Sequence, residues 1–116
     1  MTYNKDSTRY YSERQEKVVA KALNGRQTAN SGATMFSKGD VKTSHFLIEC
    51  KTLLKSSKSI SIKKEWIIKN KEEAFQTGKD YGVLAFNFGE NSENYYVIDE
   101  NLMKYLMEKI NEEYKN

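Results

Sequence analysis

Two apolar segments separated by a helical pattern constrain the fold of this chain most. Residues 45–52 and 83–88 are rich in apolar side chains over strand-like lengths, whereas residues 62–77 place apolar residues at helical spacing. When a helix connects two strands of one sheet, those strands pair in parallel. The sequence therefore predicts an α/β fold with helices packed against a sheet.

Further elements extend this unit on both sides. A helical pattern with Ser12 near its N-cap predicts a first helix, and Asn24-Gly25 supplies the stop because glycine enters the left-handed conformation freely. A short strand that opens at residues 39–41 is expected to form a hairpin with the strand 45–52. The other expected elements are an irregular strand and loop over 26–38, a strand over 95–98 and a helix over 100–113. The predicted order is αβββαββα, which indicates a mixed β-sheet flanked by helices.

Each predicted helix carries an apolar stripe at helical spacing. The stripe of the first helix consists of Tyr11, Gln15, Val18, Val19, Ala22 and Leu23. The stripe of the second helix consists of Ile62, Trp66, Ile67, Ala74 and Phe75. The last helix is expected to bury Leu102, Met103, Leu106, Met107 and Ile110. We interpret Trp66 and Phe75 as core or dimer contacts and not as base-stacking platforms.

The composition fits one domain over residues 1–116, in which the polar residues 1–8 are expected to be flexible. No stretch approaches the ~20 apolar residues of a membrane span, and the first residues hold no apolar signal core. We expect a cytoplasmic protein, in the host cytoplasm if a phage encodes it. The single cysteine, Cys50, and the single histidine, His45, exclude an intrachain disulfide, a cysteine-based zinc site and any mechanism that needs two imidazoles.

Charged side chains follow the apolar run of the strand 45–52. Because side chains alternate along a strand, Glu49 and Lys51 share one face and Cys50 takes the other, while Asp40 lies one strand earlier. Two carboxylates suit Mg²⁺, a hard cation that prefers oxygen ligands, and the Cys50 carbonyl is a candidate third ligand. Lys51 would orient or deprotonate the attacking water, or donate to the phosphorane oxygens, in phosphodiester hydrolysis. The same residues also fit an exposed strand face with a cross-strand ion pair.

Positive charge is concentrated directly after this group. Residues 51–71 hold seven lysines against Glu65 alone, whereas residues 72–116 hold four lysines against ten acids. The net charge of +3 therefore hides a basic segment beside the candidate site. Such a segment favours an anionic polymer as partner, although an ordinary solvated lysine-rich face has the same composition.

These residues and their order resemble the PD-(D/E)xK nuclease superfamily, and within it the archaeal and phage Holliday junction resolvases. The resemblance covers roughly residues 12–51 and the later order of helix and strands. Its motifs are Ser12-Glu13-Arg14-Gln15 at the start of a helix, Asn30-Ser31-Gly32 in a loop, Gly39-Asp40-Val41 and Ile48-Glu49-Cys50-Lys51. The chain departs from the family in two places, because Gly39 stands where the superfamily name has proline and the Asn30-Ser31-Gly32 loop replaces a longer Gly-Ser-rich run.

The resemblance implies a restriction-endonuclease-like fold and a Mg²⁺-dependent DNA endonuclease in which Mn²⁺ would substitute. Asp40 matches the first acid of the family, Glu49 and Lys51 match its second acid and its lysine, and Glu13 matches the helix glutamate that completes the metal site. Periodicity by itself leaves Glu16 open as the helix acid, since it lies about one turn from Glu13. The resemblance also implies a role in phage DNA recombination.

The implied substrate is branched DNA, with the four-way Holliday junction first. A junction presents two symmetric strands for cutting, so a two-fold homodimer would place one site on each. The candidate DNA contacts are Arg9, Arg14, Arg26, Ser31, Lys38, Lys55, Lys63 and Lys64. Contacts of this kind to phosphates position DNA without reading its sequence. The alternatives are another structure-specific or non-specific nuclease of the superfamily, a non-catalytic DNA-binding module of the same fold, and a small interaction protein.

Overall fold

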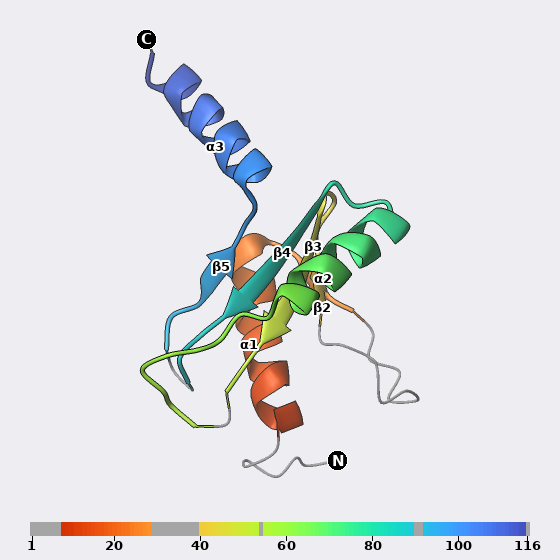
Figure 1. Cartoon of the computed structure of the whole chain (residues 1–116), viewed down its shortest axis with the longest axis vertical. Coiled ribbons are helices and arrows are strands. Elements are labelled where there is room, and N and C mark those ends of the chain that lie inside the picture. Colours follow the sequence, from red (N-terminus) through yellow and green to blue (C-terminus); the bar gives the residue numbers. More distant parts are fainter. Residues whose placement is uncertain (1–7, 29–39, 54, 90–91, 116) are drawn as a thin grey trace.

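The computed structural model describes residues 8–28, 40–53, 55–89 and 92–115, with side chains from residue 13 onward (Figure 1). Its elements in chain order are α1 (Thr8–Leu23), β1 (Arg26–Gln27), β2 (Asp40–Lys42), β3 (Phe46–Lys51), α2 (Lys64–Gln76), β4 (Tyr81–Phe86), β5 (Tyr95–Val97) and α3 (Glu100–Glu113). The predicted order of helices and strands is confirmed. Of the segment 1–8 that was expected to be flexible, residues 1–7 lie outside the described part and Thr8 begins α1.

The described strands form one five-stranded mixed sheet in the order β1-β2-β3-β4-β5. β2 and β3 pair antiparallel as the predicted hairpin, and β3 and β4 pair in parallel. α2 is the crossover between these two parallel strands, so the prediction from the spacing of apolar segments is confirmed. α1 covers one face of the sheet and α2 the other (Figure 1).

Both faces of β3 are buried, because each carries a helix. On the α1 side, Ile48 packs in a core cluster with Val19 and Val41. On the α2 side, the buried side chain of Asn70 donates a hydrogen bond to the carbonyl of Leu47 at 3.4 Å. A Cβ atom on Gly82 would lie 2.4 Å from Asn70 Oδ1, so the absence of a side chain there lets α2 approach the sheet closely.

α1 ends at Leu23 as predicted, but it differs from its prediction in its start, in the residue that turns the chain after it, and in its orientation. It begins at Thr8, before the predicted cap at Ser12. Asn24, not the following glycine, takes the left-handed conformation with φ of 55°. Gly25 is needed for close approach instead, because a Cβ atom there would lie 2.9 Å from the carbonyl oxygen of Lys42.

The buried face of α1 is rotated from the predicted stripe. The buried residues are Gln15, Glu16, Val19 and Ala20, which follow one another at helical spacing. Val18 and Leu23 were expected in the core but are 57% and 40% exposed. Gln15 is buried as predicted, whereas Glu16 turns toward the sheet where Val18 and Leu23 were expected.

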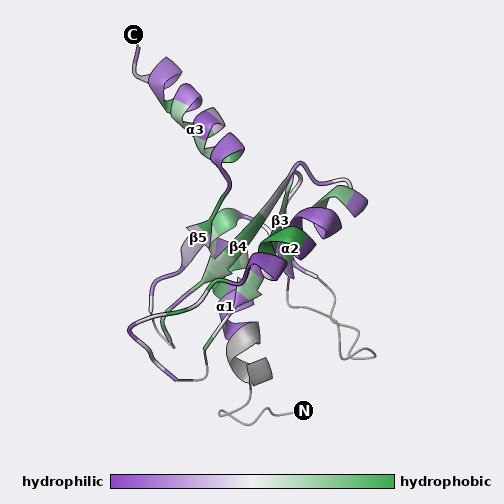
Figure 2. Cartoon of the chain, in the orientation of Figure 1, coloured by the Kyte–Doolittle hydropathy of each residue, from purple (hydrophilic) through white to green (hydrophobic). Residues whose placement is uncertain are grey.

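The apolar residues of α3 are largely uncovered, contrary to the prediction that they would be buried. Leu102 is buried, but Met103, Leu106, Met107 and Ile110 are between 40% and 52% exposed. α3 extends away from the sheet beyond β5 (Figure 1), and Figure 2 shows hydrophobic stretches along it that face no other element.

On α2, Phe75 was expected on the inner stripe and is 85% exposed, because Asn70 and Ala74 form the buried face. Among the described residues, no helix is long and apolar enough to cross a membrane.

Candidate functional site

The two strand acids of the predicted site lie directly opposite each other. Asp40 of β2 and Glu49 of β3 are cross-strand partners in the antiparallel ladder. Side chains at such positions point to the same face with Cβ atoms about 5 Å apart. Glu49 is 3% exposed, and its strand is flanked by β2 and β4. Two carboxylates are therefore held side by side at the end of the sheet, one of them almost without solvent.

Lys51 lies beside this pair on the same face of β3. Its Nζ atom is 3.7 Å from Glu49 Oε2, and the side chain of Lys51 is 27% exposed against 4% for that of Glu49. The Lys51 ammonium also lies 4.3 Å from the centroid of the Trp66 ring, which comes from the first turn of α2. The ammonium is thus close to both a carboxylate and an aromatic ring.

Cys50 points to the opposite face, toward α1, as alternation along the strand predicts. Burial raises the pKa of the Cys50 thiol far above its usual range, and the charges of Glu16, Asp40 and Glu49 raise this pKa further. The thiol therefore stays protonated near neutral pH and is unsuited to act as a nucleophile or as a metal ligand. Its backbone carbonyl remains the group of this residue that suits a hard cation.

The helix acid that reaches this end of the sheet is Glu16. Its side chain is buried, and its charge acts on Cys50 together with those of Asp40 and Glu49. Gln27 Nε2 of β1 donates to Glu16 Oε1 at 3.5 Å. Glu13, which the resemblance favours, is half-buried because it lies to one side of the α1 face that packs on the sheet. Glu16 therefore lies on the α1 side of the sheet with Cys50, and its assignment as the helix acid of the site stays a prediction, as does that of Glu13.

The arrangement suits magnesium better than a metal held by a closed set of side chains. Among the described residues, no three histidine, cysteine, aspartate or glutamate side chains are grouped so that they could hold a metal ion. Asp40 and Glu49 are adjacent, however, and the Cys50 carbonyl follows in the chain. Mg²⁺ is commonly bound by one or two carboxylates, with water and substrate phosphate completing its shell. The two strand acids therefore fit this cation.

Gln15 belongs to the Ser12-Glu13-Arg14-Gln15 motif at the start of the first helix, on which the resemblance to the nuclease superfamily partly rests. In the structure its side chain links α1 to the sheet. Its side chain is 4% exposed. Its Nε2 donates to the carbonyl of Ala85 at 3.3 Å and to Asn94 Oδ1 at 3.2 Å, and Asn87 Nδ2 donates to the same Asn94 oxygen at 3.3 Å. These bonds tie α1 to the end of β4, near the strand end that carries Glu49.

The candidate DNA contacts are solvent-facing where the structure describes them. Arg14, Arg26, Lys55, Lys63 and Lys64 are exposed. Ser31, Lys38 and the side chain of Arg9 lie outside the described residues.

The sequence prediction missed two cations and one aromatic residue. Lys42 and Lys79 line a hollow with Arg26 at the turn between β2 and β3, and Lys79 Nζ donates to the Thr43 carbonyl at 2.7 Å. Trp66 contacts Lys51, which the sequence prediction did not anticipate. The feature of the sequence that could have indicated this contact is the single tryptophan among the lysines at the start of α2.

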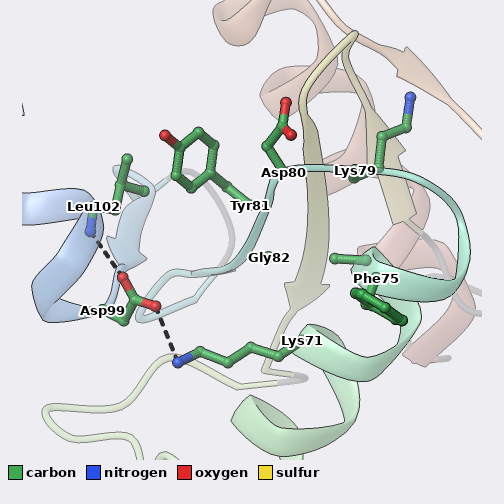
Figure 3. Close-up of a pocket in the computed structure, with 9 residues that line it drawn as sticks. Lys71, Phe75, Lys79, Asp80, Tyr81, Gly82, Asp99 and Leu102 are labelled. Carbon is green, nitrogen blue, oxygen red and sulfur yellow. Dashed lines mark hydrogen bonds and ion pairs between the residues drawn. The ribbon is translucent and has the colours of Figure 1, made fainter. Parts of the chain in front are cut away.

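A separate pocket lies between α2 and the start of α3, away from the acids (Figure 3). Asp99 caps α3 by accepting a hydrogen bond from the Leu102 amide at 2.9 Å, and its other carboxylate oxygen lies 3.0 Å from Lys71 Nζ. The Leu102 amide and then Lys71 lower the pKa of Asp99 below its usual value of 3.8. In this pocket Asp99 and Lys71 are engaged in a helix cap and an ion pair, and Asp80 pairs with His45.

We expect Asp99→Ala to destabilise the protein by about 1 kcal/mol at pH 7, because α3 loses its N-cap acceptor. A carboxylate whose pKa is lowered by folding contributes stability above its unfolded pKa and loses it as the pH falls through the folded value. The difference between variant and wild type should therefore shrink below pH ~4. Urea denaturation at pH 7 and pH 3 measures both values. Asp99→Asn keeps the acceptor and serves as control, and an equal loss for both variants would show that the cap is not the cause.

Comparison of the chain with protein-family models, curated proteins and solved structures gave no match.

Proposed function

We propose that this protein is a Mg²⁺-dependent endonuclease that hydrolyses phosphodiester bonds in branched DNA, with the four-way junction as its principal substrate. The observation that carries the proposal is the direct cross-strand pairing of Asp40 with the buried Glu49, beside Lys51. Like charges directly opposite each other in a sheet are destabilising, so a fold that keeps them gains from a cation between them. The mixed sheet with a helix on each face agrees with a restriction-endonuclease-like core.

Each residue of the group has a distinct role in this hydrolysis. Asp40, Glu49 and the Cys50 carbonyl would hold the cation, with Glu16 contributing negative charge from α1. The bound Mg²⁺ supplies an activated water and neutralises charge on the phosphate. The Lys51 ammonium donates to the phosphate oxygens or orients the attacking water, within reach of Glu49.

The exposed cations near Lys51 suit the DNA backbone. Lys63 and Lys64 lie at the start of α2, and Lys63 Nζ is 5.7 Å from the same Trp66 ring that Lys51 contacts. Phosphate contacts of this kind position the duplex and make binding depend strongly on salt. Arg26, Lys42 and Lys79 offer a second basic surface at the turn between β2 and β3, where another arm of a junction can bind.

The active form in this proposal is a homodimer, and α3 supplies its interface. Met103, Met107, Ile110 and Tyr114 follow at intervals of four, three and four residues, and Leu106 lies three residues after Met103, so they form one exposed stripe along the helix. A 14-residue helix is marginal in water unless its apolar face is covered. A second copy of α3 carries the same apolar stripe over the same length, so two copies can cover each other. In a dimer with two-fold symmetry, each of the two sites would face one of the two strands that are cut in a junction.

A cleavage assay tests the proposal. The wild type is incubated with labelled four-way junction, flap and linear duplex, each with Mg²⁺ and with EDTA. We expect paired symmetric nicks in the junction, with Mg²⁺ only. Binding without cutting of any substrate would contradict the endonuclease, and equal cutting of all three substrates would contradict the preference for junctions.

A further inference from the structure

Trp66 is the single tryptophan of the chain and lies beside the candidate site. It is half-buried in the first turn of α2, and its ring centroid is 4.3 Å from Lys51 Nζ and 5.7 Å from Lys63 Nζ. Both distances are within the ~6 Å over which the negative face of an indole attracts a cation. The Trp66 ring is therefore close to the ammonium groups of two of the seven lysines of residues 51–71.

Lys51 needs such a contact if it is to act at one position. A lysine side chain has a flexible four-carbon stem, and its ammonium is a point charge without the fixed geometry of a guanidinium. The 3.7 Å separation between its Nζ and Glu49 Oε2 exceeds a good hydrogen bond, so the carboxylate alone does not fix the ammonium. Trp66 adds a second contact to the ammonium, at 4.3 Å from the ring centroid.

We propose that Trp66 is a positioning residue. It holds the Lys51 ammonium next to Glu49, where the ammonium can contact the phosphate of the bound DNA. The inference rests on the proposed nuclease function, in which Lys51 contacts the reacting groups. The ring also draws Lys63 toward the same place, so that a second cation lies beside the DNA strand to be cut. The indole acts as an anchor for ammonium groups, and the face that carries Lys51 is not open to a stacked base.

Kinetics of ring variants provide the first test. A phenylalanine at this position keeps an aromatic face, whereas a leucine keeps an apolar side chain without one. We expect Trp66→Leu to lower the single-turnover cleavage rate about tenfold, since a displacement of 1 Å can cost about 100-fold. The Kd for junction DNA, measured in EDTA, should rise by a smaller factor than the rate falls, because Lys63 is one of several phosphate contacts whereas Lys51 acts on the reacting groups. Trp66→Phe should recover only part of the rate, because a phenyl ring attracts cations less strongly than an indole.

Equal rates for Trp66→Leu and Trp66→Phe would overturn the inference, and so would a loss confined to DNA affinity. Thermal unfolding of both variants shows whether they fold. If the leucine variant does not fold, Trp66→Phe and Trp66→Tyr still decide: rates that follow the strength of the ring's attraction for cations support the inference, and a phenylalanine rate equal to that of the wild type contradicts it.

Intrinsic fluorescence provides a test that needs no catalysis. Because the chain holds a single tryptophan, its emission reports on Trp66 alone. We expect Lys51→Met to change the emission clearly and Lys63→Met to change it less, because the Lys63 ammonium is farther from the ring. Unchanged emission in Lys51→Met would overturn the inference. A wild type that cuts no DNA but shows the Lys51 response would contradict the nuclease proposal and leave the anchoring of Lys51 by Trp66 supported.

Discussion

Asp40→Asn is expected to abolish cutting while leaving the folded protein as stable as the wild type or slightly more so. The variant removes one of two carboxylates that face each other across β2 and β3. Without the metal, the transition state of hydrolysis loses several kcal/mol of stabilisation. The cleavage rate should therefore be lower by at least about 10³-fold. In the absence of metal the variant also loses a like-charge contact, which is worth about 0.5 kcal/mol. A purely structural acid would behave differently, because its removal would cost stability.

Three measurements define this result. Cleavage of the four-way junction gives the rate, urea denaturation in EDTA gives the free energy of unfolding, and the same titration in Mg²⁺ shows whether the cation stabilises the fold. A ligand that binds only the native state raises stability with its concentration, so Mg²⁺ should stabilise the wild type and not Asp40→Asn.

Asp80→Asn is the matched control for this variant. Asp80 is an exposed acid that pairs with His45 at the other end of β3, so its neutralisation should leave cutting and the Mg²⁺ response intact. If Asp40→Asn instead lost stability and still cut the junction, Asp40 would be a structural residue and the proposed site would be wrong.

The double variant Met107→Glu and Ile110→Glu is expected to convert a dimer into monomers. Both side chains lie on the exposed stripe of α3, where they are 50% and 52% exposed in the single chain. Burial of such a side chain contributes about 2 kcal/mol, so loss of two in each chain should raise the Kd for dimerisation by at least about 10³-fold. Size-exclusion chromatography with light scattering measures the mass over a range of concentrations.

Lys104→Glu is the matched control for the interface. It changes the charge by the same amount as the double variant, but Lys104 lies about 100° around the helix from Met103, off the stripe. Its ion pair with Glu100 is exposed, so its loss should have little effect on folding. A wild type that is monomeric at all concentrations would contradict the dimer. Monomers that cut the junction symmetrically at the wild-type rate would show that the dimer is not needed.

Sequence patterns predicted most of the backbone arrangement. The spacing of apolar segments gave the order of the elements, and a helix between two buried strands required their parallel pairing. The hairpin between β2 and β3 then set Asp40 opposite Glu49. These features follow from local periodicity and from the short connections that a chain of this length permits.

The rotation of the helices was predicted less well, because several faces of a helix can carry apolar residues. For α1, the pattern favoured a stripe that runs from Gln15 through Val18 and Leu23, whereas the structure buries Gln15 together with Glu16 and leaves Val18 and Leu23 exposed. The Nε2 atom of Gln15 donates to Ala85 and Asn94, and these partners are about 70 to 80 residues away in the chain. No local pattern indicates that such partners are present, so the burial of Glu16 on this face required the packed structure.

The sequence by itself determined the α/β class, the parallel crossover and the strand face that Glu49 and Lys51 share, because each depends on periodicity and on adjacent elements. The tertiary structure decided which helix acid reaches the sheet end, which apolar face of α3 stays uncovered, and that Trp66 lies over Lys51. These depend on how separate elements are rotated and placed against one another. Side-chain contacts between distant segments fix that placement. A hydrophobic pattern indicates that one face of a helix must be covered, but it does not indicate which element covers it.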